Sequence, residues 1–401
     1  MTREELTKSF LEDTHRNFIL ELATGFGKTF LALSKIDKWK QEVPNNEDFK
    51  ILIVIPRLVL KDNWITEINK FHFNSLLPNI TFVTYVSLPK YAGNHYDIIV
   101  ADEGHHTSER CMNALNHIKS THMLVLSATL KKEHKFFFTT KYKAHIIKVN
   151  TKEAIDSNVL PDPKVILIPL TLDNVNFNCI IEKNIKKNTP KNTIKTIGYS
   201  EKWKYRSYKG PLNIVCTPQQ YYTDTSNLIE WYKQKGMRNA IMKNIWLHKA
   251  GERLKWLAKQ KADLIRSLLK ELKNYRILTF CPSIEQSESL GCPCVNSKVG
   301  TENLDRFNNK KIKHIASVAM LDEGISPIDC KIGLFQMINS SLRLLTQREG
   351  RILRHKEPVL IFPYWKYTRE QEIIDEFIKD YNPKLITTLD TYSINNIKKY
   401  I

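Results

Sequence analysis

The sequence lacks any long apolar run, since none approaches the roughly 18 consecutive residues that a membrane-spanning helix requires. Its opening stretch, MTREELTKSF, has neither the basic nor the apolar part of a secretory signal peptide. The seven cysteines are scattered, and Cys292 and Cys294 have no second pair that could complete a tetrahedral zinc site. We therefore expect a protein without membrane contact and with free thiols, located in the cytoplasm, or in the host cytoplasm if the chain is viral.

The chain is too long for one ordinary hydrophobic core, because 401 residues suit two domains of roughly 150 to 200 residues each. With 42% hydrophobic residues it can bury two cores, which excludes wholesale disorder. Short apolar runs alternate with polar helical stretches, first as FILEL, ILIVIP, ITFVTYV, YDIIVAD, HMLVLSAT and HIIKV, and later as RILTFC, KHIASVAM, KIGLFQMI and PVLIFPY. Such runs indicate strands that are buried on both faces of a parallel sheet.

The expected fold is therefore α/β, with two tandem parallel-sheet domains at residues 1–157 and 158–401. Their junction is expected at Asn158–Pro163, where two prolines break regular structure. Val165–Leu170 is predicted to add a strand to the second domain.

Positive charge is concentrated in one part of the chain, whose formal net charge is +19. Residues 181–280 hold 22 basic and 7 acidic residues, whereas residues 1–180 hold 22 and 20, and residues 281–401 hold 17 and 15. A general bias of composition would spread the excess evenly. The pattern predicts a basic insertion at about 175–273 in the second domain, which would attract the nucleic-acid backbone.

Within this insertion, residues 175–215 are expected to be extended or loop-rich, and residues 218–273 largely helical, because leucines from Leu247 to Leu272 keep helical spacing. The insertion also holds four of the seven tryptophans, which are Trp203, Trp231, Trp246 and Trp256. Their rings could stack on bases, or they could pack between helices, and the sequence favours neither.

A phosphate-binding loop is predicted at ATGFGKT, residues 23–29, because this segment follows an apolar strand and opens a helix. The expected nucleotide contacts are Thr24, Gly25, Phe26, Gly27, Lys28 and Thr29. The two glycines would let backbone amides face the phosphates, Lys28 would reach the β and γ phosphates, and the Thr29 hydroxyl would bind Mg²⁺.

Two carboxylates, Asp102 and Glu103, directly follow the apolar strand DIIVA. At the carboxyl end of a parallel strand, Asp102 could hold the Mg²⁺ of a bound nucleotide. Glu103 could then act as the general base that polarises the attacking water. His105 and His106 come next, and a metal site there is disfavoured because adjacent histidines rarely converge on one ion.

These two motifs, followed by LSAT at 126–129 and QREGRILR at 347–354, resemble superfamily 2 helicases and translocases of the DExH kind. LTFCPSIEQSESL at 279–290 and ASVAMLDEGI at 316–325 are similar to the fourth and fifth motifs of that superfamily. Within this superfamily, the sequence most resembles compact phage helicases and the motors of restriction and excision-repair systems. The resemblance implies two RecA-like domains that hold ATP between them.

The resemblance also implies residue roles. Gln347, Arg351 and Arg354 would face the nucleotide from the second domain, with Arg354 as the arginine finger, and their spacing places them on one helical face. Glu323 and Gly324 would lie in the cleft. Five strand-end residues would contact nucleic acid, namely Pro56, Arg57, Thr84, Tyr85 and Ser283. Ser127, Ala128 and Thr129 would couple the two sites, although the Ser127 and Thr129 hydroxyls could simply cap a helix.

Two features depart from the family pattern: no upstream glutamine that would read adenine is found, and Ser326 stands where many relatives have an acidic residue. The expected function is an ATP- and Mg²⁺-dependent helicase or translocase that acts on a nucleic-acid single strand or fork, with DNA favoured, and that could serve replication, repair or recombination proteins. An RNA remodelling enzyme, a translocase on duplex DNA and a non-enzymatic clamp are the alternatives; the intact Lys28, Glu103 and Arg354 set argues against the last.

Overall fold

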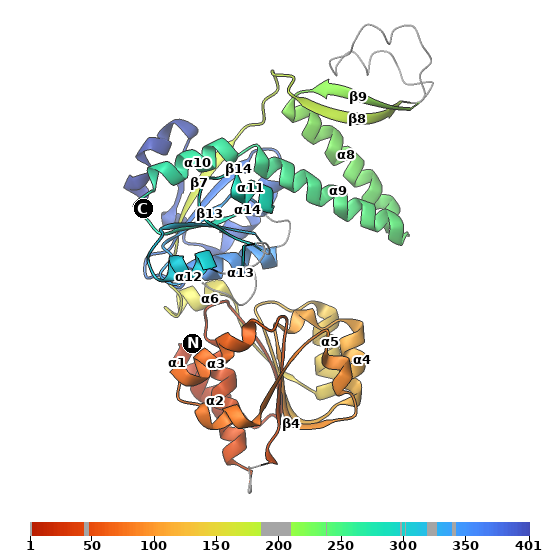
Figure 1. Ribbon diagram of the computed structural model, residues 1–401, viewed down its shortest axis with the longest axis vertical. Coiled ribbons are helices and arrows are strands. Elements are labelled where there is room, and N and C mark those ends of the chain that lie inside the picture. Colours follow the sequence, from red (N-terminus) through yellow and green to blue (C-terminus); the bar gives the residue numbers. More distant parts are fainter. Residues whose placement is uncertain are drawn as a thin grey trace.

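The computed structural model describes residues 2–43, 48–185, 210–237, 239–296, 299–300, 302–318, 327–338 and 342–401. Its two main sheets are entirely parallel and lie one above the other in Figure 1. Among the helices of these residues, none has the length and apolar character needed to cross a bilayer.

The first sheet has the strand order β3-β2-β4-β5-β1-β6. Its strands are β1 (Asn17–Leu22), β2 (Ile51–Ile55), β3 (Ile80–Thr84), β4 (His95–Asp102), β5 (Lys119–Ser127) and β6 (His145–Val149). Its helices are α1 (Arg3–Glu12), α2 (Lys28–Gln41), α3 (Leu60–Lys70), α4 (Glu109–His117), α5 (Lys132–Tyr142) and α6 (Thr151–Asp156). Figure 1 shows α1, α2 and α3 on one face of this sheet and α4 and α5 on the other. Alternate residues of the central strands therefore enter two separate apolar layers.

One prediction about this sheet is wrong. The runs ITFVTYV and HIIKV form β3 and β6, but neither is buried on both faces, since Thr81 of β3 is exposed and Ile146 of β6 is 40% exposed. The reason is topological: β3 and β6 are the two edge strands of the sheet and pair only with β2 and β1, so less protein covers them.

The second sheet has the strand order β11-β12-β10-β13-β14-β7-β15. Its strands are β7 (Lys164–Leu170), β10 (Ile277–Phe280), β11 (Cys294–Val295), β12 (His314–Ser317), β13 (Ile332–Phe335), β14 (Val359–Trp365) and β15 (Ile386–Thr388). The helices around it are α10 (Ala262–Glu271), α11 (Ile284–Glu288), α12 (Glu302–Asn308), α13 (Leu342–Ile352) and α14 (Arg369–Phe377). The predicted strand at Val165–Leu170 is confirmed, because β7 pairs with β14 along its whole length.

An arm is inserted between β7 and α10. It consists of the antiparallel strands β8 (Cys179–Ile185) and β9 (Gly210–Cys216) and of the helices α8 (Pro218–Gly236) and α9 (Ala240–Lys259). Figure 1 shows it projecting away from the second sheet.

The expected extended segment at 175–215 thus contains a strand pair, and the expected helical segment is divided into α8, α9 and α10. Leu247 does not lie on a buried face, since it is 52% exposed. The structure gives the tryptophans no common role: Trp231 is 49% exposed, whereas Trp256 packs on Tyr221 with a ring separation of 4.5 Å. Trp203 lies outside the described residues.

Candidate active site

The loop between β1 and α2 curls as the sequence predicts. Gly25 and Gly27 have φ angles of +89° and +105°, a region that other residues rarely adopt, and Gly27 is the N-cap of α2. Phe26 between them is fully buried in the first core. Lys28 Nζ donates to the carbonyl oxygens of Leu22 at 2.9 Å and Ala23 at 3.4 Å. The loop therefore brings an ammonium group and the amino end of a helix to one point, which is an arrangement that favours anions.

The electrostatics of Lys28 show which charges gather around it. Burial lowers the pKa of Lys28, while the negative charges of Glu103 and Asp102 act to raise it. The positive charges of Arg354 and Arg351 lower it further. The loop, the end of β4 and the end of α13 thus meet in one cleft between the two sheets.

The pKa values of the two carboxylates in this cleft are shifted in opposite directions. Burial and the neighbouring Glu103 charge raise the pKa of Asp102 to about 6, against a hydrogen bond of 2.9 Å from Trp64 Nε1 to its Oδ2. Burial alone would also raise the pKa of Glu103, but the adjacent His105 and the charge of Lys28 outweigh it and hold this pKa below its usual range. Glu103 is therefore the member of the pair that keeps its negative charge to lower pH.

A polar chain runs from Glu103 to the end of β5. His105 Nδ1 lies 3.3 Å from Glu103 Oε2 and 3.3 Å from Ser127 Oγ, and the Ser127 hydroxyl donates to the Thr129 carbonyl at 2.9 Å. Ser127 is fully buried, and Ala128 connects it to Thr129. His105 has no predicted role in catalysis, because its adjacency to His106 in the sequence suggests only a metal site. Within the described ranges, no three His, Cys, Asp or Glu side chains are placed to share a metal ion.

Helix α13 presents buried polar side chains to the cleft. Gln347 is 2% exposed, and neither atom of its side-chain amide has a hydrogen-bond partner among the described residues. Arg351 is likewise buried. The prediction that Gln347, Arg351 and Arg354 share one helical face is wrong for Arg354. Helix α13 ends at Ile352, and Arg354 lies exposed in the turn beyond it. The turn forms because the His355 amide bonds the Ile352 carbonyl at 3.0 Å, which redirects the chain.

Helix α13 also touches the phosphate loop directly. A Cβ atom at Gly350 would lie 2.3 Å from Thr24 Cβ, so only glycine allows this approach. Leu353, three residues on, is 1% exposed and belongs to the apolar core of the first sheet, together with Leu160. The predicted phosphate contact Thr24 therefore packs its side chain against the second half of the chain.

Arg3 is a residue of this region that the sequence did not reveal. Its Nη2 donates to the Gly25 carbonyl at 3.3 Å, and it lines a cavity of about 850 Å³ whose other walls include Gly25, Lys70, Leu160 and Arg354. The buried Lys35 fixes α1 in this place by donating to three carbonyls near the helix end, at 2.6 to 3.2 Å. Arg3 was not among the predicted site residues. The only feature of the sequence that points to it is a basic residue in a short helical stretch ahead of the loop.

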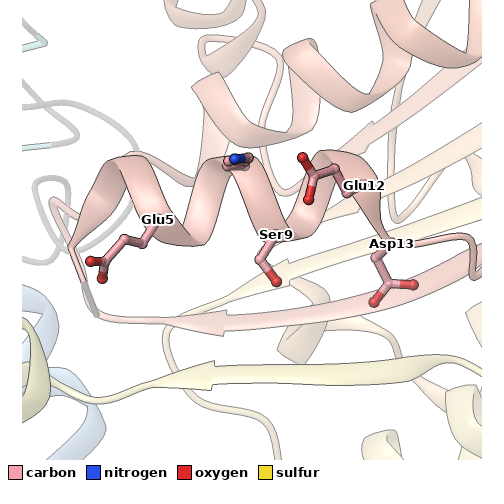
Figure 2. Close-up of a pocket in the computed structure, with 5 residues that line it drawn as sticks. Glu5, Ser9, Glu12 and Asp13 are labelled. Atoms are coloured by element: carbon pink, nitrogen blue, oxygen red, sulfur yellow. The ribbon is translucent and has the colours of Figure 1, made fainter.

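A second concavity, of about 480 Å³, lies beside α1. Figure 2 shows that its wall is built from α1 and Asp13 alone, with the acidic side chains of Glu5, Glu12 and Asp13 along it. It shares none of the groups that converge on Lys28, so it is separate from the cleft.

The predicted nucleic-acid residues lie at strand ends, but one of them is not accessible. Arg57 is exposed, Pro56 and Thr84 are half-buried, and Ser283 caps α11 by accepting from the Gln286 amide at 3.3 Å. Tyr85, in contrast, is 5% exposed, and its hydroxyl donates to the Asp102 carbonyl at 2.8 Å. A side chain buried to this degree does not fit a contact with nucleic acid. The hydroxyl group of Tyr85 instead stabilises the end of β4 through its hydrogen bond to the Asp102 carbonyl.

The predicted cleft residues Glu323 and Gly324, and Ser326 beside them, lie outside the described residues.

Comparison with known proteins gives one family and several relatives. The family model for the res subunit of type III restriction enzymes matches residues 2–132. The chain is 24% identical over 383 residues to the DNA 3′-5′ translocase XPB2 of Sulfurisphaera tokodaii, covering 88% of this chain and 78% of that protein.

Two solved structures share the fold at low identity. S. cerevisiae Dbp5 bound to RNA and ADP BeF3 has a TM-score of 0.60 at 13% identity, covering 99% of this chain and 91% of that one. The Pyrococcus furiosus Hef helicase domain has a TM-score of 0.50 at 13% identity, covering 93% and 97%. These likenesses confirm the predicted architecture of two RecA-like parallel-sheet domains with helices between them.

Proposed function

We propose that the chain is an ATP-dependent DNA helicase or translocase of superfamily 2, DExH kind, which hydrolyses ATP in the cleft between its two sheets. The observation that carries the proposal is the close packing of Gly350 on Thr24, which brings α13 onto the phosphate loop, so that two carboxylates from one half of the chain and two arginines from the other lie near enough for their charges to act on Lys28. The family match and the relative that is a DNA translocase support DNA as the substrate. We place the domain boundary at residues 157 and 158, between β6 and β7.

The residues of the cleft fit a magnesium nucleotide. Mg²⁺ is usually held by one or two carboxylates together with water and phosphate oxygens, not by a complete protein cage. Asp102 and the Thr29 hydroxyl would supply the protein ligands, and a cation there would favour the charged form of Asp102, whose pKa is raised without it. Bound Mg²⁺ would neutralise charge on the phosphates.

Lys28 would exchange its loop carbonyls for phosphate oxygens, and Arg3 would add a second cation near Gly25 on the side of the cavity. Gly25, Phe26 and Gly27 would shape the loop, and Thr24 would hold it against α13. Glu323 and Gly324 remain proposed cleft residues on the strength of the motif alone.

Glu103 would polarise the attacking water as general base, because its lowered pKa keeps the carboxylate ionised. His105 would hold its orientation, and the chain through Ser127 to Thr129 would connect this base with the end of β5, as a coupling path requires.

Arg354 would stabilise the charge of the transition state, with Arg351 and Gln347 as further contacts. Because these three residues come from the second half, hydrolysis would require the packing of α13 on the loop, and closure of the cleft would thus be coupled to chemistry. Pro56, Arg57, Thr84 and Ser283 remain the proposed contacts of a single strand.

ATP turnover measured with single-stranded DNA, forked DNA, duplex DNA and RNA tests this proposal. We expect the strongest stimulation by DNA that contains a single strand. Stimulation by duplex DNA alone would favour the translocase that does not separate strands, and stimulation by RNA alone would overturn the choice of DNA. If no ATP turnover were measured with any of these nucleic acids, the proposed ATP-driven activity would be wrong.

A further inference from the structure

The arm is joined to the second sheet through buried polar contacts. Lys261, the N-cap of α10, and Glu370 of α14 are both fully buried, and their side chains form an ion pair of 2.8 Å. Lys261 Nζ also donates to the Pro363 carbonyl at 3.0 Å, and Trp365 Nε1 donates to the Leu257 carbonyl at 2.9 Å. A buried ion pair is costly to break, so the base of the arm is fixed and α9 must move with the second sheet.

The two helices of the arm pack closely at their far end. A Cβ atom at Gly236 would lie 2.9 Å from Lys243 Cα, so this glycine lets α8 and α9 meet backbone to backbone. Nearer the base, Arg253 Nη1 donates to Ser226 Oγ at 2.7 Å, and its guanidinium lies 5.3 Å from the centre of the Tyr222 ring. Figure 1 shows the turn between α8 and α9 at the end of these two helices that points away from the second sheet.

Large apolar side chains stand exposed at this turn. Met237 is 83% exposed and Ile241 is 69% exposed, although turns of this kind are usually polar. Lys235 and Lys243, both exposed, flank them on the two helices. Lysines can attract phosphates, while Met and Ile are among the apolar residues that proteins insert against base steps to unstack them. Leu228, Trp231 and Leu247 are exposed as well, but they lie along the bodies of α8 and α9, so Met237 and Ile241 are the apolar side chains that stand at the turn itself.

We propose that Met237 and Ile241 form an apolar wedge that packs against the terminal base pair of a DNA fork and opens it. The wedge rests on the proposed function, since the motor would drive the fork against it. Its contact with the base pair, however, needs no ATP, because the tip is exposed and the arm is held without a nucleotide.

The test uses the full chain and a DNA fork with 2-aminopurine at the junction, in the absence of nucleotide. The double substitution Met237→Gln and Ile241→Gln removes the apolar tip without lowering helix propensity at position 241, because glutamine is a better helix former than isoleucine. Leu247→Gln is the matched control, because Leu247 is another exposed aliphatic residue of α9 that lies away from the turn. Fork affinity is measured by anisotropy, and ATP turnover is measured separately with single-stranded DNA.

We expect the wild type and the Leu247 control to raise the fluorescence of the junction base on binding. The double variant should lose most of this rise, and strand displacement with ATP should fall at least about fivefold, as expected when a stacking contact is lost. Its ATP turnover on single strands should stay within about twofold of the wild type, because the tip is remote from the cleft.

An equal fluorescence rise in wild type and double variant would overturn the wedge, as would no rise in the wild type. So would an equal loss in the Leu247 control. If the double variant left every DNA readout unchanged, the tip would belong to another partner and the wedge would be wrong. Absence of ATP turnover in the wild type would count against the motor alone, because the fluorescence is read without nucleotide.

Discussion

The cleft and the arm use charge in opposite ways. In the cleft, Lys28, Asp102 and Glu103 are surrounded by protein, and the charge of each changes the pKa of another. On the arm, Lys235 and Lys243 are exposed and lie beside apolar side chains that are exposed as well. Buried charges act at fixed positions, whereas exposed charges are screened by salt and attract without fixing a position. A substitution in the cleft should therefore change chemistry, whereas one on the arm should change how nucleic acid is held.

The largest loss of ATP turnover is expected for Arg354→Ala. If Arg354 stabilises the transition state, its loss should lower kcat by about 10³-fold or more while ATP affinity changes far less. Arg369→Ala is a matched control, because Arg369 is an exposed arginine of α14 whose side chain pairs with Glu372. Steady-state turnover and nucleotide titrations measure both quantities. Similar effects of the two substitutions would contradict a special role for Arg354.

A smaller effect is expected for Gly350→Ala, which tests the contact between α13 and the phosphate loop. The new Cβ would lie 2.3 Å from Thr24 Cβ, so the loop or the helix must shift. A misplacement of about 1 Å commonly costs around a hundredfold in rate, and we expect a loss of turnover of that order. Gly251→Ala on the arm is the matched control, because nothing lies within 4 Å of its Cβ position.

The control should keep full turnover and be stabilised by up to about 1 kcal/mol, since alanine is the better helix former. Combining Gly350→Ala with Thr24→Gly should recover part of the lost rate, because the clashing Cβ is then absent. Equal turnover in the two single glycine variants would show that the contact does not matter for catalysis.

The smallest effect concerns pH. Burial and the Glu103 charge raise the pKa of Asp102 to about 6, so below that pH its carboxyl binds a proton in the folded protein and competes with a cation. We expect the Mg²⁺ concentration for half-maximal turnover to rise up to about tenfold for each pH unit below about 6 and to level off above it. Magnesium titrations across this range provide the measurement. A half-maximal concentration that does not change with pH would remove Asp102 from the Mg²⁺ site.

The sequence predicts the parts of this molecule that are local. The loop at Gly25 and Gly27 and the burial of β4 follow from short motifs and apolar runs, because a phosphate loop needs glycines at fixed places and a central strand needs apolar side chains on both faces. The two-sheet architecture follows from the order of such runs.

Contacts between distant segments were not predictable in this way. No sequence pattern near Gly350 predicts that it contacts Thr24. Likewise, no pattern near Tyr85 predicts that its hydroxyl donates to the Asp102 carbonyl. Arg354 was misplaced for a related reason, since helical spacing cannot reveal that the helix stops at Ile352. The exposure of Ile146 likewise depends on strand order, which the apolar run does not encode.

ATP turnover by Glu103→Gln in the presence of single-stranded DNA is the most direct test of the proposed catalytic site. Because Glu103 is the carboxylate whose pKa stays low beside Lys28 and His105, its amide should lower turnover by about 10²-fold to 10⁴-fold while ATP still binds. Glu133→Gln, on the exposed face of α5, should change neither quantity. Undiminished turnover by Glu103→Gln would contradict the assignment of the cleft as the catalytic site.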